Sequence, residues 1–215
     1  MRPGPERFGF ELQGDRAHVR ATDVLAALMA RFPGLPLGLK FIRPLTGPAW
    51  LHLPSPPGAA ITGRAGDIGF GLTADPSAPA RRRPADRAPA LHLSRPSLEV
   101  FAFPPGPPLA ARIAAIFDRV HPRQPERFPE RFVVRQITLH PGPARAMPVV
   151  WFRLDLAPDR MRAHLTLRTP LGPLAEIDFR LTAREPPQGT ARTSPPPAGS
   201  APASSATADG DRPAR

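Results

Sequence analysis

Apolar and polar residues alternate along several segments in the second part of the chain, and no other feature constrains the fold as strongly. The alternation runs through residues 131–139, 149–156, 161–168 and 174–181. A period of two places successive side chains on opposite faces of a β-strand. These segments therefore predict antiparallel strands that turn one face toward a core and the other toward solvent.

Shorter apolar segments earlier in the chain predict more strands, because turns that contain proline or glycine separate them. These strands are expected at residues 8–12, 18–20, 37–42, 49–53, 60–64, 68–73, 91–93 and 98–103. Thr22 is expected to cap a first helix, and Pro107 with Pro108 pre-set the start of a second. The sequence therefore predicts an α+β fold, mainly an antiparallel β-sheet with two helices.

The chain divides by composition into a body at residues 5–185 and a tail at 186–215 that is rich in Pro, Ala, Ser and Thr. Such a tail cannot bury enough apolar surface to fold, so it is expected to be disordered. Residues 74–90 are biased toward Ala, Pro and Arg, and we expect a flexible loop there that joins the halves 5–73 and 91–185.

Each half reads as a strand, a helix and four strands, and each closes on a similar phrase, FGLTA at 70–74 and FRLTA at 179–183. One interpretation is a duplicated β-α-β4 unit. The other is one continuous antiparallel sheet, or half-barrel, that grips both helices. The sequence leaves both interpretations open.

The chain has no cysteine, which excludes a disulfide scaffold, a thiolate zinc site, an iron–sulfur cluster and a cysteine nucleophile. Its six histidines form no pair at the close spacing of metal ligands, so neither a metal nor a cofactor is expected. No apolar segment approaches about 18 residues, and none follows the first residues as in a signal peptide. We therefore expect a cytoplasmic protein without a membrane span.

The formal net charge of +11 is spread thinly along the chain. Of the 29 basic residues only Lys40 is a lysine, which is typical of a GC-rich bacterial coding sequence rather than of selected phosphate contacts. Arg81, Arg82 and Arg83 form a run, and the default interpretation of such a run is a solvated loop. Nucleic-acid binding through these arginines ranks last among three functional hypotheses, because no DNA- or RNA-binding signature accompanies them.

No nucleotide-binding, phosphate-loop, serine-hydrolase or zinc-protease motif occurs in the chain, so catalytic candidates must come from the pairing of strands. A five-residue loop at 169–173 would place His164 opposite Asp178, on the polar face of the last hairpin with Arg162 and Arg180. Asp178 would then orient the imidazole as in a general-base dyad. The competing interpretation is a solvated polar face of the sheet.

Trp151 and Arg153 fall on the polar register of the strand at 149–156. An amphipathic ring at that place either covers a seam where a helix packs, or lines a groove for a ligand or a partner. Together with Arg162 and Arg180, these residues form the expected binding surface.

The first hypothesis is a soluble, non-enzymatic binding or accessory protein whose sheet face or groove holds a protein partner or a hydrophobic small molecule. The second is an enzyme that acts on small acyl or hydrophobic substrates, because a duplicated β-α-β4 unit is similar to double hot-dog thioesterases and dehydratases. This resemblance implies an acid or a histidine near the end of a helix, at the end of a tunnel, and Asp23 at the start of the first helix is the candidate. The competing explanation for Asp23 is its favourable charge at a helix N-terminus.

Overall fold

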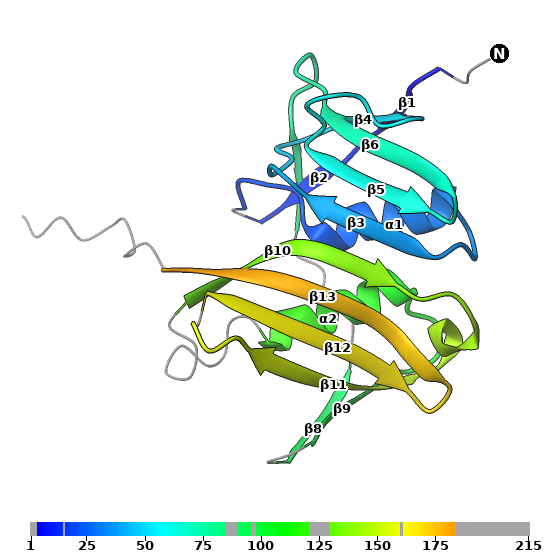
Figure 1. Ribbon diagram of the computed structural model, residues 1–215, viewed down its shortest axis with the longest axis vertical. Helices are drawn as coiled ribbons and strands as arrows, with labels where there is room; N and C mark the ends of the chain where they lie inside the picture. Colours follow the sequence, from blue (N-terminus) through cyan, green and yellow to red (C-terminus); the bar gives the residue numbers. More distant parts are fainter. Residues whose placement is uncertain are drawn as a thin grey trace, which may run out of the picture. The chain divides into compact units, whose positions relative to one another are not determined.

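The computed structural model describes residues 4–14, 16–84, 90–95, 98–120, 130–159 and 161–183 (Figure 1). The tail expected at 186–215 lies outside these residues, as does His121. Within the described part, no helix is long and apolar enough to cross a membrane.

An eleven-stranded antiparallel sheet and two α-helices make up the described fold, so the α+β class predicted from the sequence is confirmed. The sheet has the order β1-β4-β6-β5-β3-β10-β13-β12-β11-β9-β8. Its strands are β1 (Glu6–Phe8), β3 (Leu37–Phe41), β4 (Ala49–His52), β5 (Ile61–Ala65), β6 (Ile68–Ala74), β8 (Leu91–Arg95), β9 (Leu98–Ala102), β10 (Glu130–Leu139), β11 (Val149–Leu156), β12 (Arg162–Thr169) and β13 (Gly172–Ala183). A separate pair consists of β2 (Glu11–Gln13) and β7 (Arg81–Arg83).

The seam between the two halves is the antiparallel pairing of β3 with β10, where Leu39 lies opposite Ile137. In each half the strand that follows the helix lies at this seam. The halves differ in strand order, because β5 lies beside β3 whereas β13, the last strand of its half, lies beside β10, and β8 adds an edge strand to the second half. The sheet is thus continuous across both halves, and their duplication stays a prediction.

Helix α1 (Ala21–Arg31) buries an apolar stripe against the sheet, with Leu25 and Leu28 fully buried. Thr22 does not cap the helix as expected. The N-cap residue is Arg20, which makes no side-chain capping bond, and the buried Thr22 hydroxyl has no partner. The prediction failed because position 22 lies within the first turn and faces the core rather than the exposed amides of the helix end.

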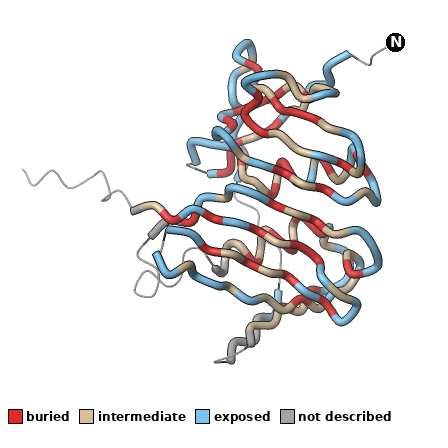
Figure 2. Tube along the Cα trace, in the orientation of Figure 1, coloured by how far each residue is buried: buried red, intermediate tan, exposed pale blue. Residues whose placement is uncertain are grey.

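Helix α2 (Leu109–Val120) follows Pro107 and Pro108 as expected, and it buries Ile113 and Ile116 completely. One apolar core joins both helices to the inner face of the sheet. Figure 2 shows buried and exposed residues alternating along the strands, as the period of two requires. An ion pair of 2.8 Å between Arg20 and Asp118 connects the start of α1 to the end of α2.

The first strands depart from the hairpin that the sequence predicted. β1 pairs with β4, whereas β2 runs parallel to β7, and residues 18–20 form no strand. The extended segment is interrupted at Gly9, between β1 and β2. On either side of it the rings of Phe8 and Phe10 pack edge to face, with centroids 5.6 Å apart. Residues 74–90, which were expected to form a flexible loop, contain strand β7.

Candidate functional site

Asp23 stands in the first turn of α1, where two other elements supply donors to its carboxylate. Gln13 Nε2, from β2, lies 3.4 Å and 3.5 Å from the two carboxylate oxygens. Arg83 Nη2, from β7, lies 3.1 Å from Oδ1. Only 19% of the Asp23 side chain is exposed, so these two donors cover much of the group.

The pKa of the Asp23 carboxyl is raised above its usual range, chiefly because burial disfavours the charged form. The positive charges of Arg83, Arg20 and Arg16 oppose this effect without cancelling it. An acid whose pKa is moved toward neutrality by burial and tuned by a specific cation is typical of proton-transfer sites. We call the side chains of Gln13, Arg20, Asp23 and Arg83 the α1 cluster.

The amide of Gln13 is fixed in orientation by a third contact. Arg20 Nη1 donates to Gln13 Oε1 over 2.8 Å, so the amide oxygen is occupied and the NH2 group faces Asp23. Arg20 Nη2 also donates to Asp118 Oδ1 over 2.8 Å. Because Arg20 keeps only 9% of its side chain exposed, the arrangement is held rigidly between the two helices.

The run of arginines that suggested nucleic-acid binding has three different environments. Arg83 bonds Asp23, whereas Arg82 Nη1 donates to the backbone carbonyls of Gly14 at 2.5 Å and Arg16 at 3.5 Å. Arg81 is exposed. Arg83 thus belongs to the α1 cluster.

Gln13 was not among the candidate residues, because the alternation that predicts a strand at 8–12 places position 13 on its polar face. In the structure Gln13 is 5% exposed and lies opposite Arg83 in the parallel pair of β2 and β7. The two strands are far apart in the sequence, and no local signal indicates that they pair.

His164 and Asp178 lie opposite each other, as the sequence predicted, and His164 Nδ1 is 2.7 Å from Asp178 Oδ1. The loop between their strands is shorter than expected, because Thr169 pairs with Gly172. A register shift after Leu167 restores the predicted pairing further along the strands. Their side chains are 40% and 51% exposed, and a catalytic role for the pair stays a prediction.

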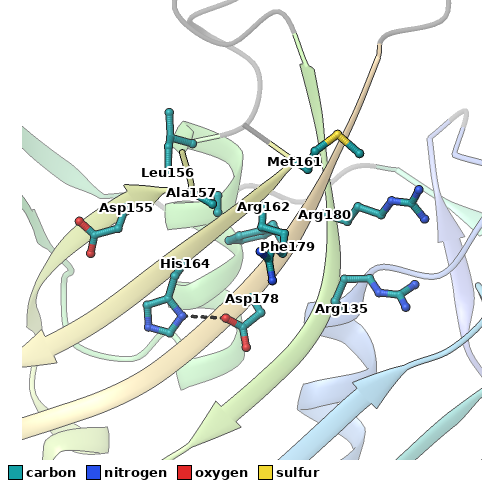
Figure 3. A pocket seen from close by; sticks show the side chains of 11 residues that line it. Arg135, Asp155, Leu156, Ala157, Met161, Arg162, His164, Asp178, Phe179 and Arg180 are labelled. Carbon is teal, nitrogen blue, oxygen red and sulfur yellow. Dashed lines mark hydrogen bonds and ion pairs between the residues drawn. The ribbon is translucent and has the colours of Figure 1, made fainter. Parts of the chain in front are cut away.

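This pair lines an open hollow of about 760 Å³ on the outer face of the sheet, beside the turn between β11 and β12 (Figure 3). Arg162 lies opposite Arg180 at this place, and Arg135 joins them from β10. Figure 3 shows Arg135 and Arg180 extending in parallel from neighbouring strands. The hollow is lined by Arg135, Asp155, Leu156, Ala157, Met161, Arg162, Ala163, His164, Asp178, Phe179 and Arg180.

Trp151 and Arg153 share the outer face with this hollow but do not line it. Trp151 is half-buried opposite Arg168, and Arg153 bonds Asp155 over 2.8 Å. The hollow does not reach Asp23 either. Asp23 is covered by its two donors, so the tunnel expected from the sequence is not provided by this hollow.

Among the residues that the structure describes, no three side chains of histidine, aspartate and glutamate gather in the manner of a metal site. His52 is half-buried beside the buried Leu51 on β4, and its Nε2 lies 2.9 Å from the Thr73 hydroxyl. His52 therefore has a structural hydrogen-bond partner on the neighbouring strand.

Comparison with known proteins gave no match to a family model and none to a curated protein. Solved structures match over most of the chain at low identity. The TesB protein of Mycobacterium avium subspecies paratuberculosis is 12% identical, with a TM-score of 0.47, and the match covers 82% of this chain and 92% of that one.

Two further structures are similar over comparable lengths. The bifunctional dehydratase-cyclase domain of ambruticin biosynthesis is 14% identical with a TM-score of 0.38, covering 77% of this chain and 83% of that one. A Lactobacillus plantarum protein provisionally assigned as an oleoyl thioesterase is 8% identical with a TM-score of 0.46, covering 84% and 96%.

The first functional hypothesis, a non-enzymatic binding or accessory protein, is corrected by these neighbours, because one is named as an oleoyl thioesterase and another as a dehydratase-cyclase domain. With identities below 25% and TM-scores below 0.5, these structures transfer no residue roles to this chain.

Proposed function

We propose that the protein is an enzyme that hydrolyses small acyl esters or thioesters, with Asp23 as its proton-transfer group. The observation that carries this proposal is the α1 cluster, in which a carboxyl of raised pKa faces the amide of Gln13 and the guanidinium of Arg83. Hydrolysis needs one group that moves a proton and donors that stabilise a developing oxyanion. The cluster contains both.

In the first step of this reaction, ionised Asp23 accepts a proton from a water molecule as the water oxygen attacks the acyl carbon. The electron pair of the carbonyl moves onto its oxygen. The amide of Gln13 and the guanidinium of Arg83 supply N–H donors of the kind that stabilises such an oxyanion. Collapse of the tetrahedral intermediate then expels the alcohol or thiol, which takes the proton back from Asp23.

Access to Asp23 requires Arg83 to move aside, since its guanidinium covers the carboxylate. Strand β7 is held to β2 by three residue pairs, and Arg83 keeps 35% of its side chain exposed. Such a short, edge-lying strand opens at low cost in free energy. The same side chain therefore tunes the acid at rest and contacts the substrate when β7 shifts.

The test is a panel of p-nitrophenyl esters and acyl thioesters of increasing chain length, assayed with the full chain. We expect hydrolysis above the buffer rate for at least one chain length, with a rate that saturates with substrate. Hydrolysis of none of them, in a protein whose circular dichroism and thermal unfolding are those of a folded α+β protein, would overturn the proposal.

A further inference from the structure

We propose that the hollow on the outer face of the sheet binds a small molecule that carries a phosphate group and an apolar portion. This inference is independent of the proposed function, because none of the residues of the α1 cluster lines the hollow. It rests on arginines without acidic partners, on acids that are already paired, and on exposed apolar side chains beside both.

Within the part of the chain that the structure describes, Arg135 and Arg180 have no hydrogen-bond or ion-pair partner, and both are exposed within the hollow. Arg135 sits at the irregularity between Val134 and Gln136, which places its side chain beside Arg180 of the adjacent strand (Figure 3). Such bulges redirect a side chain out of the regular alternation. Neighbouring cations repel each other, so an anion between them would be stabilised by both.

The acids of the hollow do not neutralise these arginines, because each is already engaged. Asp178 is bonded to His164, and Asp155 is bonded to Arg153 from outside the hollow. The bond to Asp178 also fixes the imidazole, and its second nitrogen, Nε2, has no partner among the described residues. That nitrogen is positioned as an additional contact for a ligand oxygen.

Phosphate fits this set better than a single carboxylate. A guanidinium donates two parallel N–H bonds to phosphate, and its five donors serve several oxygens at once. Arg135, Arg162 and Arg180 come from three adjacent strands, so their donors approach from different directions. Arg162 is held only weakly by an acid, since its Nη2 lies 3.5 Å from Asp159 Oδ2.

The apolar portion of the ligand is indicated by large hydrophobic side chains that remain exposed beside the arginines. Leu156 is 41% and Met161 is 51% exposed, and both line the hollow. Val133, 40% exposed, lies directly opposite Arg180. A volume of about 760 Å³ lies within the range typical of small-molecule sites.

The test measures binding of phenyl phosphate, inorganic phosphate and benzyl alcohol to the full chain by isothermal titration calorimetry at low salt. We expect phenyl phosphate to bind more tightly than inorganic phosphate, and benzyl alcohol not to bind. The double variant Arg135→Gln/Arg180→Gln should weaken phenyl phosphate binding at least about tenfold, the loss expected when charge-assisted hydrogen bonds are removed. Arg64→Gln is the matched control, because Arg64 is an exposed arginine paired with Asp67 in the other half.

Equal binding by the double variant and by the wild type would overturn the proposal. So would binding of vesicles that contain phosphatidic acid, or of an oligonucleotide, without binding of phenyl phosphate, since the ligand would then be a membrane or a nucleic acid. Ester hydrolysis measured on the same double variant should be unchanged, so the outcome does not depend on the role of Asp23.

Discussion

Arg83 Nη2 donates to Asp23 Oδ1 across 3.1 Å and joins strand β7 to the first turn of α1. The contact brings together two effects of opposite sign on one carboxyl group. Burial raises the pKa of Asp23, whereas the guanidinium lowers it. The protonation of Asp23 is therefore adjustable through a residue on a different element.

Replacing Arg83 with glutamine should shift the pH dependence of activity. Without the guanidinium charge the pKa of Asp23 rises further, so the carboxylate needed as a base forms only at higher pH. The acid limb of kcat/KM against pH should move toward neutral pH in Arg83→Gln. Rates measured across the acid range check this.

The matched control is Arg82→Gln, because Arg82 lies on the same strand and donates to the backbone carbonyls of Gly14 and Arg16. This variant carries the same loss of charge and should leave the acid limb in place. An equal shift in both variants would mean that the net charge of the protein, rather than the contact between Arg83 and Asp23, determines the pH at which the acid limb lies.

Asp23 should also leave a signature in stability. Because its pKa is higher in the folded than in the unfolded chain, the folded state holds the proton more tightly, and stability falls as pH rises through this range. The Asp23→Asn variant lacks this titrating group, so its stability does not show this decrease. The stability of the wild type relative to the variant should therefore decrease as pH rises from below the usual range of a carboxyl through the raised pKa of Asp23, as measured by urea unfolding at each pH.

Asp75 should behave in the opposite way. The Ser77 hydroxyl at 2.6 Å and Arg7 at 2.8 Å hold the pKa of its carboxyl below the usual range. Its contribution to stability is thus present above the pKa of the unfolded chain and is lost as pH falls through the lower, folded value. Asp75→Asn should be less stable than the wild type at neutral pH, and the difference should shrink in acid.

The exposed Asp67 supplies the comparison for both variants, since its nearest cation, Arg64, lies 3.7 Å away. Asp67→Asn should show neither trend. A difference between Asp75→Asn and the wild type that is constant with pH would show that packing, rather than the charge of Asp75, is responsible.

Gly63 should not tolerate alanine. A Cβ at this position would overlap the backbone oxygen of Gly38 and the fully buried ring of Phe70. Overpacking of this kind costs about 1–3 kcal/mol. Gly69, on the same hairpin, has open space around the same atom, so Gly69→Ala should change the free energy of unfolding far less.

The pairing of His164 with Asp178 was predictable in part, because alternation is a local property that decides which face each residue occupies. The turn was not predicted correctly, and the register shift after Leu167 offsets its shorter loop. The apolar stripes of α1 and α2 were predictable because a helix repeats its pattern within a few residues.

The α1 cluster was not predictable beyond Asp23 itself. Gln13 and Arg83 meet Asp23 because β2 pairs with β7, and this pairing joins segments whose compositions indicate a hairpin and a loop. Three-residue strands carry too little alternation to be read from sequence. The burial of Gln13 likewise follows from the tertiary arrangement rather than from its neighbours along the chain.

The most direct test of the central claim is kcat/KM for the best ester or thioester substrate, compared among the wild type, Asp23→Asn and Asp67→Asn. If Asp23 transfers the proton, Asp23→Asn should lose about 100-fold or more, which is typical of a general acid–base group. Asp67→Asn, an exposed residue outside the cluster, should keep the wild-type value. Full activity in a folded Asp23→Asn variant would contradict the account.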